Sequence, residues 1–352
     1  MNARGFPAFK LFTGMDGRKK TGRLLLSLLL VFLLLLSLAG CAQPSGSGPS
    51  QSGNPAAGTR QPVSAGAAGS GLQSLASGEM RVSVIDVGQG DSILVQLPDG
   101  KTMLVDGGPT VAGPNVAAYL RRRGVKRIDY LVATHPHEDH IGGLPGVLPQ
   151  FPIGQIFMTR GTTNTATFEH LLQGIKNKGL SVTTARAGVV LFQQGTLQAV
   201  FLAPSSSGYK DLNNWSAVIR LQYGNAAFLL TGDAQAQSEQ EMLASGANLR
   251  ADVLKVGHHG SATSTGPAFL RAVAPRFAVI SVGAGNDYGH PHQVTLNKLQ
   301  QAGVQVYRTD QDGTVVFTTD GKQIRVDCLP RQAVPGGIRG FVEWLRMRLF
   351  GN

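Results

Sequence analysis

Four potential metal ligands lie within six residues of one another in segment 134–143 (THPHEDHIGG), and this cluster constrains the fold more than any other feature. The cluster directly follows the apolar run 128–133, which is typical of a β-strand. At the end of a strand the chain can turn and bring several side chains to one point. Imidazole and carboxylate ligands together suit zinc, manganese or iron better than calcium or magnesium. The ligands of the predicted metal site are His135, His137, Asp139 and His140.

Short β-rich segments alternate with helical ones between residues 80 and 328. Strands are expected at 81–86, 92–97, 102–105, 128–133, 154–158, 181–184, 189–192, 197–202, 216–223, 226–230, 252–256, 277–281, 304–307, 314–318 and 323–327. Helices are expected at 115–123, 166–177, 235–244, 267–273 and 293–301. Two successive halves each run from strands to helices. The pattern therefore predicts an α/β fold, an αββα sandwich of two mixed β-sheets packed face to face with helices outside.

The first 40 residues have the pattern of a bacterial secretory signal. Six basic residues and one acidic residue lie in positions 1–23, and a leucine-rich run follows at 24–39. That run of 16 residues is short for a spanning helix, which needs roughly 20, although an uncleaved, tilted anchor is the alternative. Segment 38–41 (LAGC) resembles a lipobox, in which the cysteine is acylated. We therefore expect a lipid anchor at Cys41 and a location at the extracytoplasmic face of the cell membrane.

The rest of the chain divides into a tether, a domain and a tail. Residues 41–78 are expected to form the lipidated cysteine and a flexible linker, because glycine, serine, proline and alanine there cannot bury enough apolar surface. Residues 79–328 are expected to form one globular domain. Residues 329–352 are expected to form a basic amphipathic tail, which can lie on a membrane surface or dock on the domain.

The net charge of +11 does not identify a partner for the domain. Residues 1–23 contribute +5, and residues 331–352, with four basic residues and one acidic residue, contribute +3. A net charge of +3 remains for everything between, which is nearly balanced. Because the lipid would consume Cys41, the other cysteine, Cys328, has no disulfide partner. The fold must therefore rest on its core alone.

The histidine cluster resembles the H-x-H-x-D-H signature of the metallo-β-lactamase superfamily, and further motifs fit in order. Segments 105–108 (VDGG), 230–233 (LTGD) and 255–261 (KVGHHGS) resemble that superfamily's first motif, its bridging aspartate and its last histidine motif. More narrowly, the chain resembles the hydrolase domain of ComEC-type competence proteins. The segments that carry this narrower resemblance are 86–92 (DVGQGDS), 213–216 (NNWS) and 288–292 (YGHPH).

The resemblance implies two divalent metal ions, zinc or manganese. One would be held by His135, His137 and Asp233, and the other by Asp139, His140, Asp233 and one of His258 or His259, with His259 favoured. Two such metals polarise an electrophile and lower the pKa of bound water toward ~7. The residues expected to act on the substrate are Asp139, His258, His292 and Asn214.

Several assignments stay open at this point. His290 or His292 can donate a proton or bind phosphate, or simply cap the next helix. Many superfamily members have another histidine ligand between the second and fourth motifs, but here only His170 is available, and we expect it on the solvent face of a helix. Asp86 and Asp91 are expected to form turns in the first loop. The basic cluster at 121–127 can contact nucleic-acid phosphates, although a solvated helix end is the commoner arrangement.

The function that the resemblance implies is a nuclease acting on DNA outside the membrane. The chain contains no multispanning channel, so a role in DNA uptake would need a separate channel as partner. The alternatives are hydrolysis of phosphodiesters on cell-wall polymers, as in phosphorylcholine esterases of similar fold, and a non-catalytic DNA-uptake scaffold. Lactamase or thioester-hydrolase activity fits the motifs less well. A fold alone does not fix a function.

Overall fold

The computed structural model describes residues 75–330. The predicted signal peptide, the lipidated Cys41, most of the predicted linker and almost all of the predicted tail lie outside the described residues. Within 75–330, no helix has the length and hydrophobicity that a membrane crossing requires. The first strand begins at Met80 and the last one ends at Leu329.

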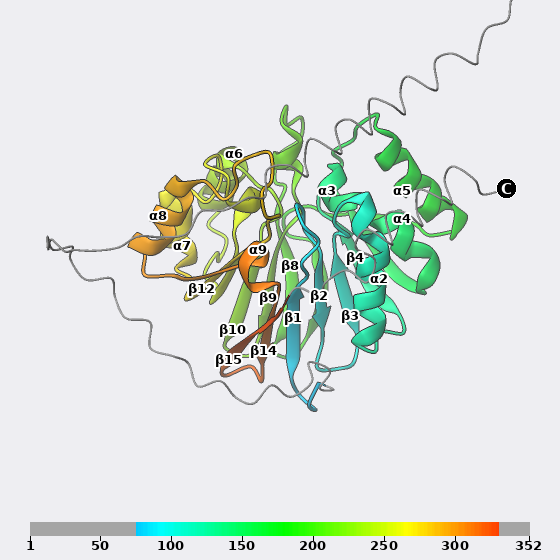
Figure 1. Ribbon diagram of the computed structural model, residues 1–352, viewed down its shortest axis with the longest axis horizontal. Helices are drawn as coiled ribbons and strands as arrows, with labels where there is room; N and C mark the ends of the chain where they lie inside the picture. The colour runs from blue at the N-terminus through cyan, green and yellow to red at the C-terminus, as the bar shows by residue number, and fades with distance from the viewer. Residues whose placement is uncertain (1–74, 331–352) are drawn as a thin grey trace, which may run out of the picture. The chain divides into compact units, whose positions relative to one another are not determined.

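Two mixed β-sheets form the centre of the described region (Figure 1). The first sheet has eight strands in the order β15-β14-β1-β2-β3-β4-β5-β6, and the second has seven in the order β13-β12-β11-β10-β9-β8-β7. The strands of the first sheet are β1 (Met80–Val84), β2 (Ile93–Gln96), β3 (Thr102–Val105), β4 (Ile128–Ala133), β5 (Ile153–Met158), β6 (Val182–Thr184), β14 (Thr314–Thr319) and β15 (Ile324–Leu329). Those of the second are β7 (Val190–Gln194), β8 (Leu197–Ala203), β9 (Val218–Tyr223), β10 (Ala226–Leu230), β11 (Val253–Lys255), β12 (Phe277–Ile280) and β13 (Gln305–Arg308).

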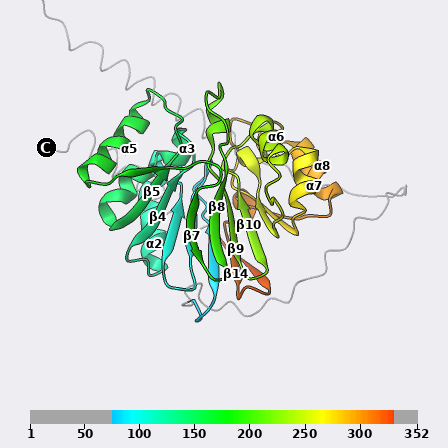
Figure 2. The same ribbon diagram turned by 180° about the vertical axis from the view of Figure 1, so that it is seen from behind.

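Helices cover the outer face of each sheet, as Figures 1 and 2 show from opposite sides. The first sheet carries α2 (Gly113–Arg122), α3 (Glu138–Ile141), α4 (Leu144–Val147) and α5 (Ala166–Asn177). The second carries α6 (Ala236–Ala244), α7 (Pro267–Val273) and α8 (Gln293–Gln301), and α9 (Thr309–Asp312) links β13 to β14. Short 3-10 turns complete the set: η1 (Thr110–Ala112), η2 (Leu148–Gln150), η3 (Leu212–Trp215) and η4 (Gly257–Gly260). The predicted αββα sandwich is confirmed.

Three hydrophobic layers hold the sandwich together. The central layer lies between the sheets and joins residues of both, among them Val82, Phe201, Phe228 and Phe317. A second layer packs α2 and α5 on the first sheet, and a third packs α6, α7 and α8 on the second. β1, β3 and β10 are buried at every residue. Of these, β10 is apolar throughout, as expected of a strand that faces a packed layer on both sides.

Parallel strands bring the strand ends that precede the sequence motifs to one edge of the fold. In the first sheet β3, β4 and β5 are parallel, and in the second β10, β11, β12 and β13 are parallel. The motif residues follow the carboxyl ends of β3, β4, β10 and β11, where the chain leaves a buried strand. Ligands of open α/β sheets bind beyond the carboxyl ends of parallel strands. The fold therefore gathers the motifs at the same edge.

Candidate metal centre

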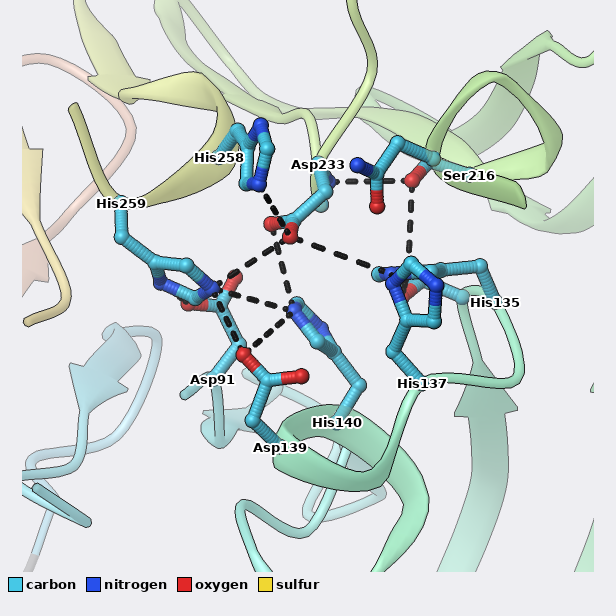
Figure 3. Close-up of polar contacts among 12 residues, drawn as sticks. Asp91, His135, His137, Asp139, His140, Ser216, Asp233, His258 and His259 are labelled. Atoms are coloured by element: carbon cyan, nitrogen blue, oxygen red, sulfur yellow. Dashed lines mark hydrogen bonds and ion pairs between the residues drawn. The ribbon is translucent and has the colours of Figure 1, made fainter. Parts of the chain in front are cut away.

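Loops from both sheets supply the side chains of the centre. His135 and His137 follow β4, and Asp139 and His140 belong to the one-turn helix α3 that begins just after them. Asp233 follows β10, and His258 and His259 lie in η4, after β11. Figure 3 shows these side chains pointing toward one another around Asp233. The structure thus brings the predicted site residues together from three strand ends, those of β4, β10 and β11.

The predicted ligands form two groups that share one carboxylate, and Asp91, Asp106 and His140 form a third cluster beside them. Asp139, His140, Asp233 and His259 each offer an atom within 4.8 Å of the others, and so do His135, His137 and Asp233. These are the two sets that the sequence resemblance implied, with His259 as the last histidine. Asp233 is 2% exposed and lies between the groups. Its two oxygens are therefore placed to serve both.

The atoms of the first group are in close contact. His259 Nε2 lies 3.1 Å from Asp139 Oδ2 and 3.4 Å from Asp233 Oδ2. His140 Nε2 lies 3.2 Å from Asp233 Oδ1. The second group is more open: His135 Nε2 lies 3.0 Å from His137 Nδ1 and 3.9 Å from Asp233 Oδ2.

Hydrogen bonds on the far side of two rings show that this donor set fits a metal. His259 Nδ1 donates to the carbonyl oxygen of Ser281 at 2.8 Å, because a carbonyl can only accept. His140 Nδ1 donates to Asp106 Oδ2, also at 2.8 Å. If both rings were neutral, with their protons on Nδ1, they would direct lone pairs at each other from Nε2 atoms 3.3 Å apart. Only a proton or a cation between them relieves this repulsion, so the residues present fit a bound metal.

The electrostatics of the centre favour positive charge. Burial opposes protonation of His259, but the carboxylates of Asp233 and Asp139 outweigh it and raise its pKa to about 10. Burial also opposes protonation of His140, yet the same carboxylates hold its pKa well above the ordinary value. Burial would raise the pKa of Asp139, but His140 and His259 hold it below the ordinary range. A divalent cation would displace these protons and take over their role.

Asp106 orients the ring of His140 from the end of β3. Its Oδ1 accepts from the backbone N–H of Thr134 at 2.8 Å, and its Oδ2 accepts from the Thr134 hydroxyl at 2.6 Å as well as from His140. Asp106 has a φ of 58°, in the left-handed region that non-glycine residues rarely adopt. Asp106 belongs to segment 105–108 (VDGG), which resembles the superfamily's first motif.

The structure separates the two adjacent histidines that sequence could not order. The side chain of His259 is 1% exposed and belongs to the ligand group, whereas that of His258 is 23% exposed and lies at the rim. His258 Nε2 is 3.8 Å from Asp233 Oδ2, and its Nδ1 contacts Thr263 Oγ1 at 3.2 Å. Burial lowers the pKa of His258. Both histidines have a φ near 50°, a strained conformation of the kind that clusters at functional sites.

Two predicted substrate residues make structural contacts. Asn214 is buried, and its Oδ1 accepts from the backbone N–H groups of Gln235 and Ser238 at the start of α6. His292 Nδ1 accepts from the backbone N–H of Ala262, which lies three residues after His259. Asn214 thus stabilises α6, and His292 fixes the segment after the last ligand. The substrate roles given to them stay predictions.

His170 and the basic cluster lie away from the ligand groups. His170 is exposed on α5, as expected, and is in neither group. The basic cluster spans the end of α2 and the approach to β4, so it precedes the strand whose other end carries His135. Arg123 packs over the ring of Tyr119 and Arg127 pairs with Asp129. The cluster therefore lies at the opposite end of β4 from the centre.

The sequence interpretation missed a buried ion pair beneath the centre. Asp86 does form a turn, since its Oδ1 accepts from the backbone N–H of Gly88. Asp91 was expected to do the same, and this was wrong: its Oδ2 lies 2.9 Å from Lys255 Nζ, and both side chains are buried. The backbone N–H of Asp91 also donates to the carbonyl oxygen of Asp139. The available signal was a lysine at the end of the otherwise apolar β11.

The comparisons with known proteins agree with this geometry. The family model described as the metallo-beta-lactamase superfamily matches residues 85–284. The chain is similar to ComE operon protein 3 of Bacillus subtilis (strain 168), with 36% identity over 258 residues that cover 68% of this chain and 33% of that protein. It is also similar to competence protein ComA of Neisseria gonorrhoeae, with 33% identity over 240 residues that cover 68% of this chain and 32% of that protein. The chain thus spans about a third of the length of these curated relatives.

Among solved structures, the metallo-beta-lactamase fold protein YhfI from Bacillus subtilis is similar with a TM-score of 0.46 and 14% identity. The similarity covers 68% of this chain and 99% of that one. The family match spans more than half of the chain and includes the strand ends that carry His135, Asp233 and His259. On that match, and with the ligand groups assembled as its motifs require, the chain belongs to the metallo-beta-lactamase superfamily.

Proposed function

We propose that this protein is a two-metal phosphodiesterase that cleaves DNA outside the cell membrane. The observation that carries the proposal is the position of Asp233, whose carboxylate is shared by two ligand groups. Two metals held by such groups would polarise a phosphoryl oxygen and lower the pKa of water toward ~7. Zinc and manganese both suit this set of imidazole and carboxylate ligands.

The chain's own residues are arranged to receive an anionic substrate at the rim. His258 lies beside the shared carboxylate but is less enclosed than His259. If the hydroxyl of Thr263 donates to His258 Nδ1, the proton of the neutral ring is on Nε2, the nitrogen on the Asp233 side. His258 can then donate a hydrogen bond to a phosphoryl oxygen.

DNA is the proposed substrate because of the relatives. One curated relative is named a competence protein and another a ComE operon protein. The similarity to each covers 68% of the present chain. This chain matches only about a third of either relative. For a role in DNA uptake, the proposed partner of this domain is a DNA-uptake channel.

The proposed location rests on the sequence of residues 1–41. A basic segment, a leucine-rich run and a lipobox-like LAGC sequence are typical of a bacterial lipoprotein signal. We propose that Cys41 carries the lipid and that residues 42–78 act as a tether between the membrane and the domain.

A cleavage assay on the full-length chain tests the proposal. The metal-free protein, and the same protein reloaded with manganese or zinc, is incubated with end-labelled single-stranded and double-stranded DNA. The test variant is Asp139→Ala/His140→Ala, and the matched control is Glu138→Gln, an exposed residue of the same turn outside both ligand groups. We expect metal-dependent cleavage that the double variant loses and the control keeps.

Other outcomes would point elsewhere. Tight metal binding without DNA cleavage would overturn the nuclease and make phosphodiesters of cell-wall polymers the next substrates to assay. Failure to bind any divalent metal would overturn the proposal that the protein is a metal-dependent enzyme and would favour a DNA-uptake scaffold. Membrane fractionation of cells that express a Cys41→Ser variant tests the anchor, because an unlipidated chain should leave the membrane fraction.

A further inference from the structure

We propose that Tyr288 is a stacking platform for a nucleobase of the substrate, at the outer end of a row of rings that leads into the metal centre. The inference rests on the proposed nuclease function and deepens it. It assigns a binding site for one nucleotide of single-stranded DNA next to the phosphate that is cleaved. The row consists of Tyr288, His290 and His258, and the evidence for it is geometric.

The three rings are in successive contact. The ring centroids of Tyr288 and His290 are 5.6 Å apart, with a 22° angle between the planes, which is a stacked pair. The centroid of His290 is 5.4 Å from that of His258 in an edge-to-face contact. His258 Nε2 is in turn 3.8 Å from Asp233 Oδ2. The row therefore connects a surface ring to the carboxylate that both ligand groups share.

Tyr288 is exposed in a way that the fold does not explain. It is 66% exposed, and it is the one aromatic residue among the exposed large apolar side chains of residues 75–330. Its stack with His290 occupies one face of the ring. A tyrosine presents a large apolar area with few rotatable bonds, so ordering it on a ligand costs little conformational entropy. The other face is therefore suited to a planar partner.

The loop that carries Tyr288 is held in shape by one side chain. Asn286 Nδ2 donates to the carbonyl oxygens of Gly283 and His290, at 2.9 and 2.7 Å. Asn286 Oδ1 accepts from the backbone N–H groups of Tyr288 and His290, at 3.1 and 3.0 Å. Three of these hydrogen bonds hold the backbone of Tyr288 and His290, and the fourth ties the loop to Gly283. Preorganisation of this kind reduces the entropic cost of binding.

The single exposed ring of Tyr288 suits a nucleobase better than other planar or cationic ligands. Every nucleobase has a π-face, and aromatic side chains that stack on successive bases are a general feature of proteins that bind single strands. A choline headgroup is also attracted to aromatic faces, but it is recognised by cages of several rings. Tyr288 offers one ring on the solvent side of His290, which suits a base better than a quaternary ammonium group.

A fluorescence experiment on the full-length chain tests the platform without relying on turnover. The probe is a short oligothymidylate that carries one 2-aminopurine, whose emission is quenched when the base stacks. Binding is measured in the presence of a chelator, and an oligonucleotide with an abasic residue in place of 2-aminopurine competes. The variants are Tyr288→Ala and Tyr288→Phe. The matched control is Val294→Ala, which truncates another exposed apolar residue six positions along the chain.

We expect Tyr288→Ala to weaken binding of the probe by about fivefold to a hundredfold, the range of one lost base stack, and to abolish its quenching. Tyr288→Phe and Val294→Ala should bind within about twofold of wild type, because the first keeps the ring and the second leaves the platform intact. The abasic competitor should bind wild type and Tyr288→Ala equally.

Each other result overturns the inference in an identifiable way. Equal binding and quenching by wild type and Tyr288→Ala would refute the stacking role of Tyr288. The nuclease proposal would still hold if DNA is cleaved. If Tyr288→Ala lost binding to a choline phosphodiester but bound the probe as wild type does, Tyr288 would be assigned to a cell-wall substrate. A wild-type chain that neither binds the probe nor cleaves DNA would overturn both proposals together.

Discussion

Lys255 Nζ lies 2.9 Å from Asp91 Oδ2 in a buried ion pair that joins the first loop of one sheet to a strand of the other. Neither side chain reaches solvent, with exposures of 0% and 2%. The same loop is held to the second sheet by the Ser281 hydroxyl, which donates to the carbonyl oxygen of Gly90. Because Asp91 also bonds to the backbone of Asp139, the pair supports the metal centre from below.

Removing one partner of this pair should be costly, and removing both should be less so. Lys255→Met leaves the Asp91 carboxylate buried without compensation and should lower the free energy of unfolding by about 3–5 kcal/mol. In Lys255→Met/Asp91→Asn no charge is left unpaired, so part of that loss should be recovered. Denaturant unfolding of the single and double variants forms the cycle. Strict additivity of the single changes would show that the two charges do not interact.

Replacing Asp233 should weaken the binding of both metals, whereas replacing His137 should weaken the binding of one. Asp233→Ala removes the carboxylate common to both ligand groups, while His137→Ala leaves the group of Asp139, His140, Asp233 and His259 intact. We expect less than one metal per chain for Asp233→Ala and about one for His137→Ala, against about two in wild type, because two metals sharing one ligand define the centre. Elemental analysis after gel filtration gives these ratios. Equal metal content in the two variants would argue against a shared ligand.

Gly90 should tolerate a side chain far less well than Gly88, although both have a positive φ. A Cβ on Gly90 would lie 2.1 Å from the carbonyl oxygen of Asp139, whereas one on Gly88 would meet nothing within 4 Å. Gly88→Ala should cost about 1–2 kcal/mol from the left-handed backbone alone. Gly90→Ala should cost more and weaken metal binding by about tenfold or more, since it displaces the ligand loop. Calorimetric metal titration of the two variants provides the comparison, and equal affinities would contradict it.

Glu239 should make stability fall as pH rises above about 4.5. Burial raises the pKa of Glu239 above its usual value, although the backbone N–H groups of Gly266 and Thr265 that bond to it oppose the rise. Between the unfolded and folded pKa values the native protein binds more protons than the unfolded chain, so the contribution present below the unfolded pKa is lost through that window. Glu239→Gln should remove this part of the slope. Unfolding free energies from about pH 4 to 7 measure it, and parallel slopes would refute it.

The layer order and most elements follow from local sequence. The apolar run 128–133 becomes β4 with the predicted bounds, and the helix expected at 166–177 is α5. Periodicity is strong in such segments because one face or both must be buried. The one-turn helices α3 and α4 were not predicted, since four residues are too few for a periodic signal.

The sequence by itself determined which residue types gather at one edge. Each ligand motif follows an apolar strand, and the carboxyl ends of parallel strands meet at the same edge of a sheet. That rule predicted one site around His135, His137 and His140, whereas the division of the ligands into two groups was implied by the resemblance to the metallo-β-lactamase superfamily.

Only the tertiary structure decided which neighbour each of these side chains bonds to or pairs with. His259 rather than His258 enters the ligand group because a left-handed turn directs it to Ser281 O, twenty-two residues away. Asp91 leaves its expected turn for Lys255, and Asn214 bonds to the start of α6. These choices depend on contacts between segments far apart in the chain. Local pattern carries no information about such pairings, since burial and hydrogen-bond geometry are set only when the two sheets pack.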